Sequence, residues 1–306
     1  MSVNLPTHYA RQFANSIDLL LQARGGRLRG SVTSKMYQGQ DGSPVDQVGA
    51  VEMSEVTERF GAMPRTDAPT ARRWIGPRWF DLNQQIDYKD LKQVANDPQS
   101  ALVQSGALAV GRQQDRLIIP AFFANARTGV EGAGAAATFG TGLTAANAGN
   151  NVAVAHGASA ATGLTVAKLR EAKRKLMANH VDLEAEQAYV AITSEQHDDL
   201  LGEIQITSLD FNSQPVMQEG LVQRFLGFQF IHTELLETGT DDASGTSRQV
   251  PVWVKSGMHL ASWEEPQTEV DRRPDIRGIP TQIYMKMGMN ATRLEEGKVL
   301  RIWCRE

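Results

Sequence analysis

The 306-residue sequence contains one cysteine, Cys304. A single thiol excludes an intrachain disulfide framework and a multi-cysteine metal cluster, so burial of apolar surface or assembly must hold the chain together. The sequence also lacks a run approaching the roughly 18 apolar residues of a membrane span, and its first residues lack the apolar core of a signal peptide. We therefore expect a soluble protein without a membrane partner, made in a reducing compartment and working there.

An excess of positive charge is missing as well. Lys and Arg number 31 against 35 Asp and Glu, which gives a net charge of −4. This balance gives no electrostatic reason to expect tight, sequence-independent binding to nucleic acid and leaves room only for weak contact. Hydrophobic residues make up 41% of the chain and charged residues 22%, as in ordinary folded proteins, and the length allows about two domain-sized units.

The sequence carries no recognisable catalytic or metal-binding motif. A glycine-rich stretch at 132–142 superficially fits a dinucleotide-binding loop, but no strand precedes it, as that loop requires. The adjacent glutamates at 264–265 and at 295–296 would point to opposite faces of a strand, which prevents a shared acid–base role. The six histidines show no zinc-binding spacing. We predict no catalytic residue, no cofactor and no metal site.

The strongest helix signal lies at 97–119. Asp97 suits the N-cap, Pro98 the first helical position, and Pro120 is expected to end the helix. Two glycines inside a helix are costly, so Gly106 and Gly111 predict that another backbone or a large side chain packs closely there. The expected buried stripe is Leu102, Val103, Ala107, Ala109, Val110 and Leu117, and the expected polar face is Gln104, Ser105, Arg112 and Asp115.

A second amphipathic helix is predicted at 7–23, with Phe13, Ile17 and Leu20 on its apolar stripe. This stripe needs a partner surface. Residues 24–29 follow with two glycines and three arginines, which indicates either a solvated turn or a contact with phosphate or an acidic partner.

Residues 45–59 and 72–86 look like the two strands of a long hairpin, with a turn at 62–70. The first strand carries acids and the second carries bases. A two-stranded ribbon is marginal in water, so the hairpin should lie across the same chain or a neighbouring copy. Arginines beside tryptophans could instead stack on nucleic-acid bases. The acids are Glu52, Glu55 and Glu58, and the bases are Arg72, Arg73 and Arg78.

The remainder of the chain alternates between short elements. Residues 125–163 are too poor in large apolar side chains for a core and indicate a long loop. A helix capped by Thr165 is predicted at 165–178, with five cations on an outer face that meets solvent or nucleic acid: Lys168, Arg170, Lys173, Arg174 and Lys175. Strands at 188–192, 228–232 and 250–255, with helices at 194–201 (capped by Ser194) and 216–225, predict an α/β unit. Strands at 259–263, 267–270, 281–287 and 299–304 should pair with one another and pack on the 97–119 helix.

Several long strings show that the sequence resembles the major capsid proteins of tailed bacteriophages, in the branch without a large N-terminal scaffolding extension. The likeness runs nearly end to end. Besides the 97–119 helix, the strings are THYARQF at 7–13, PVDQVGAVEMSEVTERF at 44–60, DAPTARRW at 67–74, GASAATGLTVAKLREAKRKLMANHVDLE at 157–184, AYVAITSEQHDDLLGE at 188–203, VWVKSGMHLASW at 252–263 and NATRLEEGKVLRIWC at 290–304.

The resemblance implies an α+β, HK97-like capsid fold, whose parts coincide with the segments above. Residues 1–43 would be an N-terminal arm, and 44–88 an extended β-hairpin loop that lies over an adjacent subunit. A peripheral domain would combine 89–125, which hold the long spine helix, with a β-sheet from 258–306. An axial α/β domain would span 126–257 and gather around five-fold and six-fold positions.

The function implied is that of a structural protein that self-assembles, as pentamers and hexamers, into an icosahedral shell around a double-stranded DNA genome. The hairpin charges and the apolar stripe of the arm would be contacts between subunits. Implied partners are further copies of the chain, a separate scaffolding protein, a portal protein, in some cases a decoration protein, and packaged DNA in weak contact. Assembly would occur in the bacterial host cytoplasm and leave the protein in the virion capsid. The alternative is a soluble α/β enzyme or small-molecule-binding protein with its site in the axial-type unit.

Overall fold

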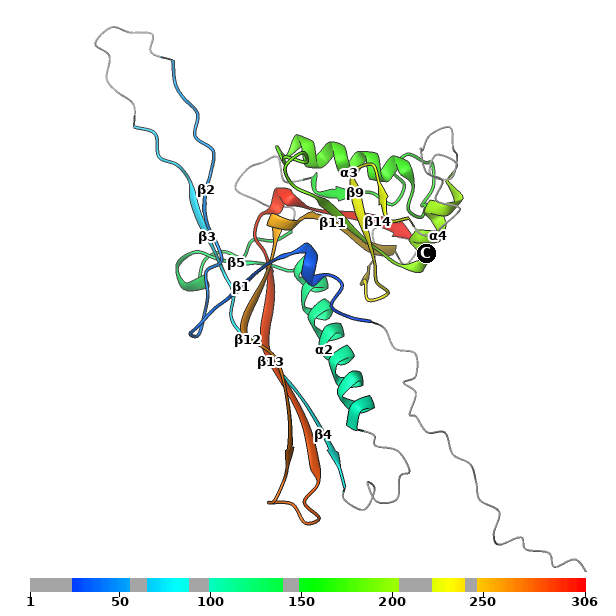
Figure 1. Cartoon of the computed structure of the whole chain (residues 1–306). Coiled ribbons are helices and arrows are strands. Elements are labelled where there is room, and N and C mark those ends of the chain that lie inside the picture. Colours follow the sequence, from blue (N-terminus) through cyan, green and yellow to red (C-terminus); the bar gives the residue numbers. More distant parts are fainter. Residues whose placement is uncertain (1–23, 56–64, 88–98, 140–148, 204–221, 240–246) are drawn as a thin grey trace, which may run out of the picture.

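The computed structural model describes residues 24–55, 65–87, 99–139, 149–203, 222–239 and 247–306. It is a mixed α+β structure whose parts extend in different directions (Figure 1). One end holds a sheet layered against helices, a long helix and long strands extend from it in one direction, and a narrow hairpin projects in another. The predicted helix at 7–23 lies outside the described residues. Within the described part, no helix is both long and apolar enough to cross a membrane.

The layered end is built on a seven-stranded sheet with the order β6-β14-β11-β7-β9-β8, in which β10 also pairs with β11. The main hydrophobic core of the layered end includes Leu169 and Leu176 of α3 and Val252 and Trp253 of β11. The elements are β6 (Asn151–Val152), α3 (Val166–Ala178), β7 (Ala188–Ile192), α4 (Ser194–Gly202), β8 (Arg224–Phe225), β9 (Phe228–His232), β10 (Thr238–Gly239), β11 (Ser247–Val254) and β14 (Val299–Arg305).

The local signals in this α/β unit are mostly confirmed. Thr165 caps α3 by accepting the N–H of Lys168, and β7, β9 and β11 lie where strands were expected. Two details are corrected. The cap of α4 is Thr193, which forms a capping box with Gln196, and not Ser194. The second correction concerns the helix predicted at 216–225. Its last two residues form strand β8, and its first six residues lie outside the described part.

The extended part consists of the long helix α2 (Gln99–Ala121) on a four-stranded sheet with the order β1-β12-β13-β4. The strands are β1 (Thr33–Met36), β4 (Trp79–Ile86), β12 (Met258–Arg272) and β13 (Thr281–Arg293). β12 and β13 form a long antiparallel hairpin, and α2 lies along it (Figure 1). The two strands predicted at 259–263 and 267–270 are one strand with register shifts between Ser262 and Gln267.

The close packing predicted at the glycines of α2 is confirmed. A Cβ on Gly106 would meet the Met285 side chain at 2.5 Å, and one on Gly111 would meet the backbone of Gly25 at 2.9 Å. The predicted end is wrong, because α2 includes Pro120. The proline lies in the last turn, where its carbonyl oxygen still accepts the N–H groups of Phe123 and Ala124.

Asp115 was expected on the polar face of α2, but its side chain is 1% exposed. Its carboxylate accepts the backbone N–H groups of Leu28 at 3.2 Å and Arg27 at 3.4 Å. Burial raises the pKa of this carboxyl, against the opposing effect of those hydrogen bonds. Helix α2 is therefore covered on a second side by the segment that follows the N-terminal region.

The projecting hairpin consists of β2 (Asp46–Val48) and β3 (Thr70–Trp74), and β3 also pairs with β5 (Arg127–Thr128). The predicted second strand at 72–86 is corrected, because the chain leaves the hairpin after Ile75 and β4 pairs with β13 in the other sheet. The interruption falls at Gly76 and Pro77, and Pro77 has no N–H to give to a ladder.

The last strand is also placed differently from the prediction. We expected 299–304 to pair with the other strands after residue 258, but β14 pairs with β11 in the seven-stranded sheet. β12 and β13 do pair with each other, and β13 packs on α2. The chain therefore returns to the layered end for its last strand.

Candidate assembly surface and its buried anchor

The β2–β3 hairpin and the segment 49–55 that continues β2 present apolar side chains that the rest of the described chain leaves uncovered. Of the first strand predicted at 45–59, the described residues form a strand only at 46–48. Val48 is 70% exposed, Val51 51% and Met53 101%. The strands pair antiparallel through Asp46 and Arg72, Gln47 and Ala71, and Val48 and Thr70. In Figure 1 the hairpin points away from both sheets. Uncovered apolar side chains on a projecting ribbon are typical of a protein–protein contact.

The residues predicted to contact neighbouring subunits differ in their exposure and in their partners within the chain. Glu52 and Glu55 are exposed on the hairpin, and Arg78 is exposed with its guanidinium over the ring of Phe80. Arg72 is exposed and pairs across the strands with Asp46, through Nη2 and Oδ2 at 2.9 Å. That hydrogen bond lowers the pKa of Asp46. Glu58, Phe13, Ile17 and Leu20 lie outside the described residues.

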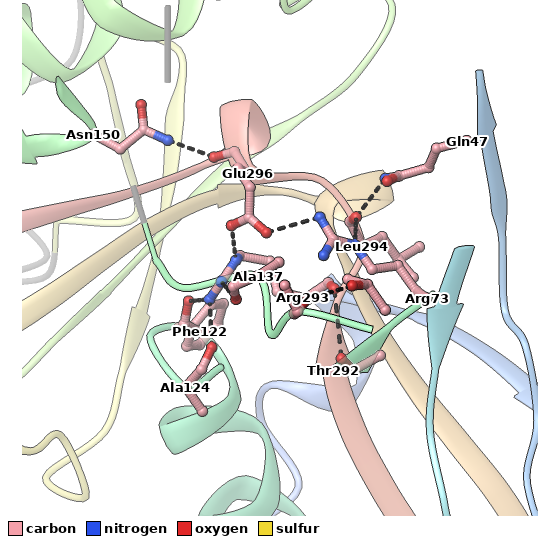
Figure 2. Close-up of polar contacts among 12 residues, drawn as sticks. Gln47, Arg73, Phe122, Ala124, Ala137, Asn150, Thr292, Arg293, Leu294 and Glu296 are labelled. Atoms are coloured by element: carbon pink, nitrogen blue, oxygen red, sulfur yellow. Dashed lines mark hydrogen bonds and ion pairs between the residues drawn. The ribbon is translucent and has the colours of Figure 1, made fainter. Parts of the chain in front are cut away.

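The structure corrects the predicted position of Arg73. It was expected to face a neighbouring subunit, but it is 4% exposed and its partners belong to its own chain. Its Nη2 donates to Oε1 of Glu296 at 2.8 Å and its Nε donates to the carbonyl oxygen of Leu294 at 3.0 Å (Figure 2). Because side chains alternate along β3, Arg72 points out while Arg73 points into the subunit.

Glu296 also binds a second arginine. Its other carboxylate oxygen, Oε2, accepts from Nε of Arg293, which is fully buried at the end of β13. Arg293 Nη1 donates to the carbonyl oxygens of Phe122 at 2.6 Å and Ala124 at 3.0 Å, just past helix α2. Its Nη2 donates to the carbonyl oxygen of Ala137 at 3.2 Å. We call Arg73, Glu296 and Arg293 the arginine–glutamate junction; Figure 2 shows the carboxylate between the two guanidinium groups.

The backbone around the junction is held as well. Asn150 donates to the carbonyl oxygen of Glu296 at 2.5 Å, and Gln47 of the hairpin donates to that of Leu294, also at 2.5 Å. Burial raises the pKa of Glu296 and lowers that of Arg73, in each case against the attraction between the two charges. The junction thus joins the hairpin, the end of α2, β13 and the segment that leads into β14.

Sequence reasoning missed this junction because it placed Glu295 and Glu296 in a strand. Glu296 begins the short 3-10 helix η7 (Glu296–Lys298). The i,i+3 spacing of Arg293 and Glu296 is the local signal that could have revealed their pairing. No local signal links Glu296 to Arg73, which lies 223 residues earlier.

Two basic segments are also placed differently from their predictions. Lys168 was expected on the outer face of α3 but is fully buried, and its Nζ donates to the carbonyl oxygens of Thr162, Gly163 and Trp303 at 2.8–2.9 Å. Arg170 and Arg174 do face outward. The predicted solvated turn at 24–29 is docked on α2, and its Arg29 pairs with Glu265 at 2.7 Å.

The comparison with protein families decides the identity. The family described as phage capsid protein matches residues 5–306. The chain belongs to the phage capsid protein family. It is a structural protein of a phage shell, located in the virion capsid, and the match gives no support to the alternative of an α/β enzyme.

Solved capsid structures have the same fold at low sequence identity. The capsid of cyanophage P-SCSP1u is 14% identical, with a TM-score of 0.73 over 100% of this chain and 96% of that one. The capsid of cyanophage Pam1 is 14% identical, with a TM-score of 0.74 over 98% and 97%. The capsid of an empty GTA particle is 14% identical, with a TM-score of 0.69 over 100% and 98%. The fold is HK97-like, as the resemblance implied. A search of curated proteins found no match.

Proposed function

We propose that this capsid protein forms an icosahedral shell of pentamers and hexamers in which each β2–β3 hairpin lies over a neighbouring copy. The observation that carries the proposal is the uncovered apolar surface of Val48, Val51 and Met53 on a projecting ribbon. A ribbon of this kind gains stability only from a surface beneath it. The similar structures are capsids of phages and of a GTA particle, which supports a shell as the assembly that this chain forms.

Charges on the hairpin would set the register of this contact more than its affinity. We propose that Glu52, Glu55 and Arg72, together with Arg78, which lies outside the hairpin just before β4, meet opposite charges on neighbouring subunits; all four are exposed. Glu58 belongs to the same proposal by its sequence position. Phe13, Ile17 and Leu20 would give the N-terminal arm an apolar stripe for a second contact.

The proposed parts follow the structure where it corrects the sequence. The axial domain is the seven-stranded sheet with α3 and α4, and it takes β14 from the C-terminal region. The peripheral domain is α2 with β1, β12, β13 and β4, so the extended loop ends before β4 instead of at residue 88. The arm is the chain before β1.

The proposal includes several partners of the shell. These are a separate scaffolding protein, a portal protein, in some cases a decoration protein, and a double-stranded DNA genome in weak contact with the inner surface. Assembly takes place in the cytoplasm of a bacterial host of a tailed phage. No enzymatic reaction is part of the proposal.

The test is a double substitution on the hairpin, Val51→Asp with Met53→Asp. Both side chains are exposed, so the subunit should fold with an unchanged melting temperature while shells are lost, as seen by light scattering and electron microscopy after co-expression with the scaffolding protein. Met177→Asp, at a side chain 60% exposed on α3, is the matched control and should still form shells. Wild-type yields of shells from the double variant would contradict the proposal.

A further inference from the structure

The hairpin is joined to the rest of the subunit by a small set of contacts, all near its base. β3 pairs with β5 through two residues, Arg73 with Thr128 and Trp74 with Arg127. Trp74 Nε1 donates to the carbonyl oxygen of Gly129 at 2.6 Å. Within the described part of the chain, Gln47 and Arg73 make further polar contacts with the body, where they reach Leu294 and Glu296. The direction of the hairpin therefore depends on a few bonds at one end.

Among these contacts, the one through Arg73 reaches furthest into the body. One carboxylate oxygen of Glu296 accepts a hydrogen bond from Arg73 of the hairpin, and the other accepts one from Arg293. Arg293 in turn holds the carbonyl oxygens of Phe122 and Ala124, at the end of α2, and of Ala137. Figure 2 shows the Glu296 carboxylate bonded to both guanidinium groups, and the three carbonyl oxygens bonded to that of Arg293.

From this arrangement we infer that Glu296 is a positioning residue, which fixes the angle at which the hairpin leaves the subunit and thereby the curvature of the shell. The inference rests on the proposed function, because the angle matters only if the hairpin reaches a neighbour. A small change of angle at the base of the ribbon becomes a larger displacement further along it, at Val51 and Met53. Neighbouring subunits would then meet at a different angle, and the shell would close at a different size.

The chemistry of the junction favours positioning over simple stabilisation. A buried ion pair is often no more stabilising than apolar side chains of similar volume, because the desolvation cost offsets the attraction. An arginine–carboxylate pair is directional, however, since the planar guanidinium and the two carboxylate oxygens fit in few orientations. An apolar contact at the same place would let the hairpin slide. The junction also carries two arginines against one glutamate, and each guanidinium binds its own oxygen, Arg73 at Oε1 and Arg293 at Oε2.

The test separates the hairpin half of the junction from the body half. Arg73→Gln removes the hairpin cation and leaves the Arg293–Glu296 pair and its carbonyl partners in place. Arg170→Gln is the matched control, because it makes the same change at an arginine that faces outward from α3 and has no part in the proposed contact. Arg73→Lys restores the positive charge and should restore part of the effect. Each variant is co-expressed with the scaffolding protein, and its particles are sized by electron microscopy.

We expect Arg73→Gln to give particles of mixed or altered diameter, Arg73→Lys to narrow that distribution, and Arg170→Gln to give the wild-type size. If Arg73→Gln gives no particles, hydrogen exchange on the unassembled subunit decides. Exchange at least about tenfold faster in β2 and β3, with the α2 amides unchanged, would support the inference. Uniform wild-type particles, or unchanged exchange in a variant that cannot assemble, would overturn it.

The two sets of variants distinguish a failure of the proposed hairpin contact from a failure of the positioning role of Glu296. If the Val51 and Met53 double variant forms normal shells, the hairpin contact itself is wrong. If that variant loses its shells while Arg73→Gln particles are indistinguishable from wild type, the hairpin contact stands and only the positioning role of Glu296 is lost.

Discussion

Gly111 in helix α2 lies against Gly25, and a Cβ built on Gly111 would come within 2.9 Å of the backbone carbonyl carbon of Gly25. The next residue, Gly26, donates its N–H to the carbonyl oxygen of Gly111 at 2.9 Å. Two backbones thus touch at a point where both residues lack a side chain. This contact fixes the chain between the N-terminal region and β1 along the long helix.

The contact predicts that Gly111→Ala destabilises the subunit. Alanine improves helix propensity by about 1 kcal/mol, but the added methyl group presses on a backbone that cannot yield, at a cost of about 1–3 kcal/mol. We expect a lower free energy of unfolding in urea. Gly106→Ala is the control, because its methyl group would meet the end of the flexible Met285 side chain, and its stability should be close to that of the wild type. Equal or greater stability of Gly111→Ala would contradict this account.

The sequence predicts most of what is local. Thr165 before an amphipathic run predicts the start of α3, and the glycines of α2 predict close packing, because capping and steric exclusion act within a few residues. Long strings of residues likewise indicate the family. These signals need no knowledge of where distant segments meet.

Long-range partners could not be predicted in the same way. β4 could have paired within the hairpin or with β13, and β14 with β12 or with β11, since a strand's alternation identifies its faces but not its neighbour. Lys168 and Arg73 have the composition of surface residues. The donors of Arg73 are satisfied by Glu296, far along the chain, and those of Lys168 by distant Trp303 as well as by nearby Thr162 and Gly163.

Charge reversal should strongly reduce the stability of the subunit at Arg73 but hardly change it at the neighbouring Arg72 of β3. Arg73→Glu places a second carboxylate beside Glu296 in the interior and should cost about 3–5 kcal/mol, because it replaces a buried pair with an uncompensated charge. Arg72→Glu breaks only an exposed pair with Asp46 and should leave stability nearly unchanged. Thermal and urea unfolding of the two unassembled subunits would measure the difference. Similar losses in both variants would show that the inward and outward sides of β3 are wrongly assigned.

His259 predicts an acid-sensitive attachment of strand β1. Its ring is 5% exposed; Nδ1 lies 2.9 Å from Oγ1 of Thr33, and Nε2 lies 3.0 Å from the hydroxyl of Tyr37. The Thr33 hydroxyl donates to the carbonyl oxygen of Met258, so it can accept from Nδ1–H, while Nε2 accepts from Tyr37. Both bonds suit a neutral imidazole.

Burial, aided by the nearby charge of Lys35, lowers the pKa of His259 from 6.5 to about 4. The unfolded chain therefore binds this proton more readily than the folded one. The contribution of His259 to stability is fully present above pH 6.5 and is lost progressively as the pH falls towards 4, by up to about 3 kcal/mol. His259→Gln removes the titrating group and retains an amide that can bond to Tyr37. We expect the free energy of unfolding of the wild type to fall more steeply than that of the variant between pH 6.5 and 4. Parallel curves over that interval would show that the folded subunit binds this proton as readily as the unfolded chain, and would contradict a neutral, buried His259 ring.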